Sequence, residues 1–290
     1  MAAVVTQSAV DSSSKQPDTT LGEGTLFQTT VSGTRRKETV FESVRLLSVV
    51  DRHEREERMS RNAPEALAEE TGVFLQQTNS GGGMPILRGM HGNRVLILVD
   101  GIRVNNSTTR AGPNQSFSTI DATMMDRIEV LRGTGSASLG SDALGGAINF
   151  LSTQASVRGT GEVHTSVVAR GAGAESSAGL EGRANWSTDR FGAVATASAR
   201  HMGNPVAGGA IGAQPFNSYN EWSASGNVAV EISDRQLVRA AVQTTQQYDV
   251  LRAYGSSPLD FRKFTRQNRL LSYARYEVQP NDLFRSARVT

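Results

Sequence analysis

The sequence contains no cysteine, very few lysines and no long hydrophobic run. Without cysteine, the chain can form neither a disulfide framework nor a thiolate metal site, and it has no cysteine nucleophile. The lysines are Lys15, Lys37 and Lys263, so arginine supplies nearly all of the basic charge. With 30 basic and 28 acidic residues the net charge is only +2, which gives no reason to expect nucleic-acid binding.

The hydrophobic runs are too short for a membrane-spanning helix. The longest aliphatic run is Val95–Val99, whereas such a helix needs ~20 apolar residues. A helical membrane protein is therefore excluded, but a β-barrel membrane protein is not. Barrel strands are short and alternating, so they leave the mean hydropathy near or below zero, and the value here is −0.34.

The amino terminus has the composition of a disordered segment. Residues 1–23 are rich in Ser, Thr, Gln and Asp and contain no aromatic residue, so we expect them not to fold. The stretch has neither a basic n-region nor an apolar h-region of sufficient length. It is therefore not a clear signal peptide.

Residues from about 27 to 153 predict a compact α+β unit. Asn62 and Pro64 are typical of a helix start, and Gly72 is suited to the left-handed backbone that ends a helix. The expected elements are a strand within 41–50, a short solvated helix at 51–58, the helix from Asn62 to Gly72, strands at 73–75 and 85–89, a mobile loop at 80–83, a helical turn at 121–125, and strands at 128–133 and up to 150.

The most informative hairpin in this unit spans 94–105. Two apolar runs flank Asp100 and Gly101, a pair that accepts the positive φ angles of a type I′ turn. The first arm is continuously apolar, which indicates burial on both of its faces.

After residue 155 the hydrophobic period changes to two. In 221–233, Trp222 and five further small or apolar residues share one face, and the other face is polar except for Ala229. A strand between lipid and a watery lumen needs this pattern. Noisier alternation occurs near 161–171, 177–187, 191–202, 236–250 and 268–279.

The connections between these segments are alternately short and long. Tight turns are expected at 187–190, 233–236 and 279–282, and long connections at 203–220 and 251–267. This asymmetry is typical of periplasmic turns and surface loops. The aromatic residues Trp186, Phe191, Trp222, Tyr248, Tyr273 and Phe284 tend to lie near strand ends, where an interfacial girdle would place them. A soluble β-sandwich remains an alternative for this region.

Segment 85–150 resembles the plug domain of TonB-dependent outer-membrane receptors. The matching blocks are PILRG (85–89), NRVLILVDGIRVNN (93–106), DRIEVLRGTGSASLG (126–140) and SDALGGAINF (141–150). Their order and spacing fit the family, with local departures at Thr134 and Leu139, where the family usually has Pro and Tyr. The stretches 110–121, 219–224 and 273–278 look most like receptors for heme or siderophores.

The resemblance implies an α+β plug domain followed by antiparallel transmembrane β-barrel strands. The expected domains are a disordered segment (1–26), the plug (27–153) and the front part of an outer-membrane barrel (154–290) that would close with about 22 strands. Six full barrel strands and the start of a seventh leave this barrel incomplete, so we expect the chain to be the front portion of a receptor in the bacterial outer membrane.

The resemblance also implies a function and partners. Such a receptor takes up a scarce ligand, for example a ferric siderophore or heme, and the plug gates the barrel. The TonB protein, with its inner-membrane energising complex, pulls on the segment ahead of the plug. The expected partners are therefore TonB, a small-molecule ligand and outer-membrane lipid, without nucleic acid.

Three sets of residues are candidates for these roles. The TonB box is expected to pair with TonB by strand addition, and the plug loops suit ligand contact because they are polar, Gly-rich and flanked by strands. Arg88 and Arg132 lie beside glycines at strand ends, where they are candidates for pairing with barrel acids. The TonB-box candidate is Gln28, Thr29, Thr30, Val31, Ser32 and Gly33, which also suits a first plug strand, and the ligand-facing candidates are Gln77, Thr78, Asn79, Ser80, Met84, Asn105, Asn106, Arg110 and Asn114.

Other classes of function find less support. His53, His91, His164 and His201 lie in separate elements without metal-ligand spacing, so we expect neither a metal site nor a cofactor, and no enzymatic activity. Two alternatives remain open: a soluble or surface-attached ligand-binding or adhesion module, and a receptor fragment without transport function of its own.

Overall fold

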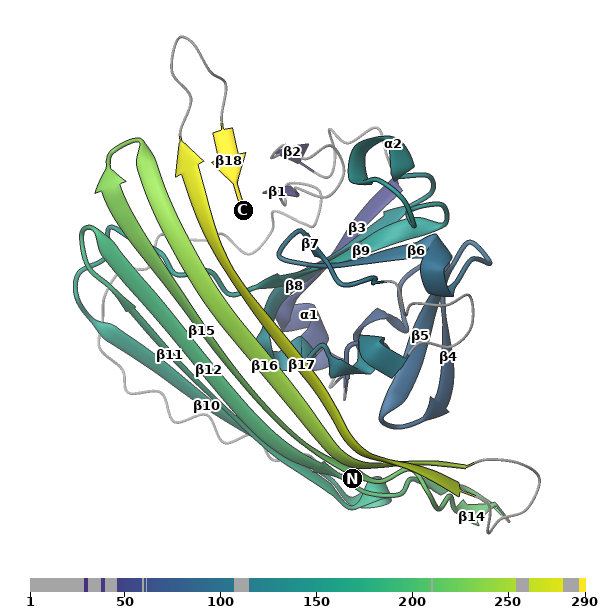
Figure 1. Ribbon diagram of the computed structural model, residues 1–290. Coiled ribbons are helices and arrows are strands. Elements are labelled where there is room, and N and C mark those ends of the chain that lie inside the picture. The colour runs from purple at the N-terminus through teal and green to yellow at the C-terminus, as the bar shows by residue number, and fades with distance from the viewer. Residues whose placement is uncertain are drawn as a thin grey trace.

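The computed structural model describes residues 29–30, 38–39, 46–58, 60, 62–106, 115–209, 211–253, 261–278 and 287–290. The first half of the chain forms an α+β unit, and the second half forms a large curved sheet that lies along one side of this unit (Figure 1). Within the described residues, no helix has both the length and the apolar character needed to cross a membrane.

Short strands and helical turns alternate in the α+β unit. They are, in chain order, β1 (Thr29–Thr30), β2 (Glu38–Thr39), β3 (Leu46–Asp51), α1 (Arg52–Glu57), η2 (Glu65–Leu67), β4 (Val73–Asn79), β5 (Gly82–Leu87), η3 (Gly92–Arg94), β6 (Val95–Val99), β7 (Ile102–Arg103), η4 (Gln115–Thr119), η5 (Ala122–Met124), β8 (Met125–Arg132), α2 (Ser136–Leu139) and β9 (Gly146–Ser152). The central sheet has the order β3-β8-β9-β6-β7, while β4 and β5 form a separate hairpin. Strands β6 and β9 are parallel, and the other neighbours are antiparallel.

Strand β6 lies inside this unit, as its apolar sequence predicts. Four of its five residues are buried, and they pack on both sides of the sheet. Val95 and Val99 belong to the larger hydrophobic cluster, which also contains Phe117 and Phe150. Leu96 and Leu98 belong to the smaller one. The sheet is therefore covered on both faces.

The Asp-Gly turn after β6 has the predicted geometry. Asp100 and Gly101 have φ angles of 52° and 81°, which is the left-handed backbone of a type I′ turn. The predicted helix after Asn62 is only the single turn η2, in which the Asn62 side chain accepts a hydrogen bond from the backbone N–H of Glu65. Gly72 ends this region with a φ of 74°.

The curved sheet is antiparallel, and it contains the strands that the alternation predicted. Its order is β10-β11-β12-β15-β16-β17-β18, and the short hairpin β13–β14 stands apart. Its strands are β10 (Val163–Ala172), β11 (Ser177–Ser187), β12 (Phe191–Met202), β15 (Tyr219–Ser233), β16 (Gln236–Ala253), β17 (Phe261–Val278) and β18 (Ala287–Val289), and the hairpin is β13 (Val206–Ala207) and β14 (Gly212–Ala213). The predicted fold class, an α+β unit followed by antiparallel barrel strands, is confirmed.

The two faces of the curved sheet differ in chemistry. On β15, Trp222 and Val230 are 39% and 40% exposed, whereas Glu221 and Ser223 are 4% and 1% exposed. The polar face is thus buried against the α+β unit and the apolar face is outside. Val230 and Trp222, with their cross-strand partners, mark the two limits of a band across the curved sheet. Within this band the outward-facing residues of β10–β12 and β15–β17 include no Asp, Glu, Lys or Arg. An uncharged outer band of this kind suits contact with lipid.

The two ends of the curved sheet also differ. One end, the turn end, carries the tight links at 188–190 and 234–235. The opposite end, the loop end, carries the long link between β12 and β15 with its hairpin β13–β14, at the bottom of Figure 1. The expected turn at 279–282 lies outside the described residues.

Two predictions about loops are wrong. The connection expected at 251–267 is mostly strand, because β16 continues to Ala253 and β17 begins at Phe261. Charged residues at this end hide the period of two. The mobile loop expected at 80–83 is the tight turn of the β4–β5 hairpin, and Gly82 and Gly83 belong to β5.

Candidate functional site between the α+β unit and the curved sheet

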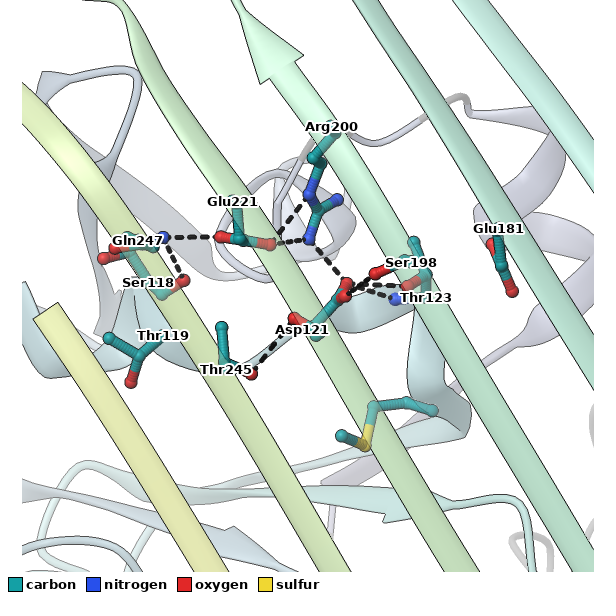
Figure 2. A network of polar contacts seen from close by, with 12 residues as sticks. Ser118, Thr119, Asp121, Thr123, Glu181, Ser198, Arg200, Glu221, Thr245 and Gln247 are labelled. Atoms are coloured by element: carbon teal, nitrogen blue, oxygen red, sulfur yellow. Dashed lines mark hydrogen bonds and ion pairs between the residues drawn. The ribbon is translucent and has the colours of Figure 1, made fainter.

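Asp121 is the centre of the contact between the two units. Its carboxylate is fully buried and faces the inner surface of the curved sheet (Figure 2). Oδ1 accepts a hydrogen bond from Arg200 Nη2 at 2.6 Å, and Oδ2 accepts one from Ser198 Oγ at 2.7 Å. Within its own unit, Asp121 also accepts from the backbone N–H and the hydroxyl of Thr123. The same side chain therefore starts helical turn η5 and fixes η5 to strand β12.

Arg200 extends the contact to the neighbouring strands. Its Nε donates to Glu221 Oε1 at 2.8 Å, and Gln247 Nε2 donates to Glu221 Oε2 at 2.6 Å. Gln247 Nε2 also donates to the backbone carbonyl of Ser118 at 3.1 Å. The chain of polar contacts thus begins at Asp121, crosses β12, β15 and β16, and returns to the α+β unit three residues away from its start.

The charge state of Asp121 follows from these partners. Burial by itself would raise the pKa of Asp121. The Arg200 guanidinium and the hydrogen bonds from Ser198 and Thr123 outweigh burial and lower the pKa from 3.8 to about 2. Asp121 is therefore ionised at neutral pH, and the contact is a buried, hydrogen-bonded ion pair.

A second buried carboxylate, Asp100, joins the units closer to the turn end. Ser152 donates to it from both its N–H and its hydroxyl at 2.8 Å, and Gln243 Nε2 donates at 2.9 Å. Tyr273 Oη donates at 3.1 Å, so Tyr273 points inward and the prediction that it belongs to an outer aromatic girdle is wrong. Arg275 donates to the Asp100 carbonyl, not to its carboxylate. Burial raises the pKa of Asp100 above its ordinary value, in contrast to Asp121.

Further side chains of the curved sheet bind the backbone of the α+β unit. Arg183 donates to the carbonyl of Thr123 at 3.3 Å, and Arg269 donates to the carbonyl of Thr119 at 3.1 Å. The sheet thus satisfies the backbone carbonyls of Ser118 and Thr119 in η4 and of Thr123 in η5.

The tip of the β4–β5 hairpin packs against the loop end of the curved sheet. Asn79 is buried, and its Nδ2 donates to the Leu251 carbonyl at 2.7 Å. A Cβ at Gly81 would lie 2.7 Å from Val250 Cγ1 and 3.2 Å from the Tyr219 ring. Glycine is therefore required here because the sheet approaches closely, and not because the loop is mobile.

We expect Gly81→Ala to destabilise the assembly by about 1–3 kcal/mol, because the added methyl group overpacks the hairpin against Val250. Denaturant unfolding in detergent measures the difference. Gly182→Ala is the matched control, because a Cβ at Gly182 meets no atom within 4 Å. Equal stabilities of the two variants would contradict the close-packing role.

A cavity of about 450 Å³ lies between the α+β unit and strands β10–β12, towards the loop end. Its lining contains basic groups, Arg58, Arg170 and Arg200, and acidic groups, Glu65, Glu175 and Glu181. The cavity is adjacent to the Asp121 network through Ser198 and Arg200. Its wall is largely apolar between these charged groups, which suits a small solute that has both apolar and charged parts.

The predicted ligand-facing residues have different environments. Asn105 is buried and holds β6, since its side chain bonds the Ile97 N–H and the Val95 carbonyl. Asn79 and Met84 are buried as well, so these three side chains pack inside the protein instead of lining an open loop. Residues Gln77, Ser80 and Asn106 retain surface exposure, the side chain of Thr78 is not described, and Arg110 and Asn114 lie outside the described residues.

Arg132 binds within the α+β unit. It donates to Ser48 Oγ at 2.9 Å, to Glu70 Oε2 at 3.2 Å and to the Thr71 carbonyl. Glu70 therefore takes the place of the barrel acid that we expected. Arg88 is exposed, and its pairing with a barrel acid stays a prediction.

The candidate TonB box is described only at Thr29 and Thr30. These residues form β1, which pairs with Glu38 and Thr39 of β2. Gln28, Val31, Ser32 and Gly33 lie outside the described residues. The extended backbone of β1 agrees with both alternatives left by the sequence, a TonB box and a first strand.

Sequence reasoning missed the residues that make the central contact. Asp121 was expected only to begin a helical turn, and Arg200 had no assigned role. Glu221 offered the one usable signal, because a charge at an alternating position of a lipid-exposed strand must face inward. Among the described residues no cluster of three or more His, Asp or Glu side chains is placed to hold a metal.

Comparison with known proteins agrees with this architecture. The sequence model of the TonB-dependent Receptor Plug Domain matches residues 39–147. The vitamin B12 transporter BtuB of Vibrio vulnificus is 32% identical over 162 residues, which cover 55% of this chain and 25% of that protein. The iron-regulated outer membrane virulence protein of Vibrio cholerae is 38% identical over 144 residues, which cover 46% and 21%. The chain thus spans about a quarter of the length of these relatives.

Solved structures share the fold. Pseudomonas aeruginosa FpvA, bound to heterologous pyoverdines, superposes with a TM-score of 0.69 at 16% identity, covering 90% of this chain and 35% of that one. The copper transporter OprC superposes with a TM-score of 0.67 at 18% identity, covering 84% and 36%. Residues 39–147 thus belong to the plug-domain family of TonB-dependent receptors, and the curved sheet that follows has the fold of the corresponding part of these solved outer-membrane proteins.

Proposed function

We propose that this chain is the front portion of a transporter that takes up a scarce ligand across the outer membrane, with energy supplied through TonB. In this proposal residues 27–153 form the plug and 154–290 the first part of the barrel. The plug closes the barrel at rest and shifts when TonB pulls on the segment ahead of it. Candidate ligands are ferric siderophores, heme and comparable small molecules, because one relative is named as a vitamin B12 transporter and the similar solved structures include a ferric enterobactin receptor and FpvA bound to pyoverdines.

The observation that carries the proposal is the polar character of the plug–barrel contact. Asp121 and Asp100 are held by side chains of four different barrel strands, β12, β16, β17 and, through Arg200, β15. Polar groups that separate from each other regain hydrogen bonds with water, so the net cost of breaking each bond is only about 0.5–1.5 kcal/mol. An interface of this kind holds the plug in place at rest through many hydrogen bonds. It can still open without exposing a large apolar surface to water.

Uptake measurements test the proposal. Cells that produce the full-length receptor are supplied with labelled vitamin B12 and with a panel of ferric siderophores, with and without a functional TonB. We expect one ligand to bind in both strains but to accumulate only in the strain with TonB. Accumulation that is independent of TonB, or a protein that stays soluble and monodisperse without detergent, would reject the proposal in favour of a binding or adhesion module.

A further inference from the structure

The two ends of the curved sheet, on either side of the uncharged outer band, carry different charges. At the loop end, the link 203–218 contains no charged residue, and Asp249 pairs with Lys263 at 2.6 Å. The described tips of β16 and β17 contain this one acid and four basic residues, Arg252, Arg262, Lys263 and Arg266. At the turn end, the tight links and the ion pair beside them contain three basic and three acidic residues, Arg158, Arg190 and Arg235 with Asp189, Glu231 and Asp234. Net positive charge is therefore concentrated at the loop end.

A polar row lies directly beyond the uncharged band at the loop end. It consists of His201, Asn220, Tyr248 and Arg266, which are cross-strand partners on β12, β15, β16 and β17. The row is two residues beyond the row of Trp222, so its side chains lie on the same outer face, because side chains alternate along a strand. Neighbouring strands are ~4.8 Å apart, so the row extends over about 14 Å.

Arg266 is the cationic end of this row. It is exposed, and its position is fixed by two neighbours. Its Nη2 donates to Gln246 Oε1 at 2.6 Å, and its guanidinium lies 5.5 Å from the centre of the Tyr248 ring. Tyr248 Oη donates to the same Gln246 oxygen at 2.6 Å. A guanidinium has five N–H donors, so Arg266 retains donors for a charge-assisted bond to a phosphate.

The other end of the row suits hydroxyl groups. His201 and Asn220 are exposed, and His201 Nδ1 lies 2.8 Å from Asn220 Oδ1. Because an amide oxygen only accepts, Nδ1 is the donor of this bond. Nε2 of a neutral His201 is then an acceptor, and the amide nitrogen of Asn220 is a donor. An acceptor and a donor side by side match the hydroxyl groups of a sugar, which donate and accept.

The outer surface next to the polar row is apolar. Trp222, Ala199 and Leu180 form the adjacent row, in which Leu180 is 56% exposed. On β17, Leu270 is 72% exposed. A water-soluble anion would contact only the polar row, whereas a lipid has acyl chains that also cover this apolar surface. The position of the row at the edge of the band therefore favours a lipid.

We propose that the row of His201, Asn220, Tyr248 and Arg266 binds the headgroup of a phosphorylated glycolipid in the outer leaflet of the outer membrane. Arg266 binds a phosphate, His201 and Asn220 bind sugar hydroxyls, and the acyl chains lie along the uncharged band. The other basic residues at the tips of β16 and β17 attract the anionic headgroup. The loop end faces the outer leaflet because long links lie on the outside in barrels of this kind. The inference rests on the membrane position of the curved sheet and not on transport.

Lipid binding to the full-length receptor tests this site. The receptor is purified in detergent, freed of bound lipid and titrated with diphosphoryl lipid A, a glycolipid with a phosphorylated disaccharide headgroup. Native mass spectrometry measures the bound lipid, and heat-modifiable electrophoretic mobility verifies folding. We expect Arg266→Gln to weaken binding about tenfold or more, because a hydrogen bond to a charged group is lost. Arg235→Gln is the matched control, since Arg235 is also exposed but lies at the turn end, and it should bind as the wild type does.

Equal affinities of the wild type and Arg266→Gln would overturn the phosphate contact. Asn220→Ala is expected to weaken binding severalfold, and an unchanged affinity would overturn the sugar contact.

Two further probes identify the source of the phosphate. Phosphatidylglycerol is expected to bind more weakly than the glycolipid, and equal binding would overturn the choice of a glycolipid. Inorganic phosphate at the concentration of the lipid is expected not to compete, and full competition would show a site for a free anion instead of a lipid. These measurements are made in detergent without TonB, so their failure would leave the proposed transport function standing, and loss of TonB-dependent uptake would leave the lipid site standing.

Discussion

Replacing Asp121 by asparagine is expected to lower the free energy of unfolding by about 3 kcal/mol, because breaking one side of a buried, hydrogen-bonded ion pair leaves its partner incompletely compensated. Arg200 would keep Glu221 but lose the second carboxylate, and the Ser198 hydroxyl would lose its charged acceptor. Denaturant unfolding of the full-length receptor in detergent measures this loss. Hydrogen exchange of the η5 backbone should report local loosening of the plug.

Asp126→Asn is the matched control. Asp126 lies in the same plug, five residues further along the chain, and pairs with Arg52 at 3.2 Å on the surface. Exposed ion pairs contribute only about 0–1 kcal/mol, so this variant should differ little from the wild type. If both variants lost a similar free energy of unfolding, the buried Asp121 network would contribute no more to stability than an exposed ion pair.

The Asp121 contribution should depend on pH in a defined direction. The pKa of Asp121 is lowered in the folded protein from 3.8 to about 2, so the folded state favours the ionised form. Its stabilisation is fully present above pH 3.8 and is lost as the pH falls through about 2. The difference in stability between wild type and Asp121→Asn should therefore be constant at neutral and mildly acidic pH and disappear only in strong acid. A difference that already vanishes near pH 6 would contradict the ion pair.

Deleting residues 24–33 is expected to abolish energised uptake while ligand binding remains. The segment contains β1, whose extended backbone lies at the amino-terminal end of the plug and pairs only with the short strand β2 in the described sheet. A two-stranded ribbon leaves an outer edge to which another strand can be added. The uptake assay uses the ligand whose accumulation depends on TonB. Binding of the same ligand to de-energised cells is measured separately, so that a loss of uptake can be distinguished from a loss of binding.

A deletion of equal length at residues 6–15 serves as the control for shortening the amino terminus. It removes part of the Ser- and Thr-rich segment and should leave uptake intact. Unchanged uptake after deletion of 24–33 would remove the TonB-box assignment. Loss of ligand binding as well would show instead that the segment is needed for folding.

Local features of the fold could be predicted from the sequence. The Asp-Gly turn depends on two residues and their φ angles, and β6 depends on five consecutive apolar side chains. The long barrel strands follow from a period of two, because one face meets the apolar exterior and the other meets the plug. In each case the determining residues are neighbours in the chain.

The functional contact could not be predicted in the same way. Asp121 meets Ser198 and Arg200 across 77 and 79 residues of sequence, and no local pattern indicates which inward-facing barrel residue lies opposite a given plug residue. Glycine was misleading for a related reason. Gly81 suggested flexibility, whereas its neighbours in space, Val250 and Tyr219, require a residue without a side chain.

Strand β3 has a consequence for how mechanical load enters the plug. It comes first among the strands of the central sheet, yet it lies at the edge, and among the described strands it pairs only with β8, over six residues from Leu46 to Asp51. Within the central sheet, tension applied to the preceding segment therefore reaches the β3–β8 ladder first. Ser48, Glu70 and Arg132 bind one another at this seam. If the seam yields, the pairing among β8, β9, β6 and β7 remains, so a pull on the amino terminus can detach one strand and leave the rest of the plug in its place against the barrel.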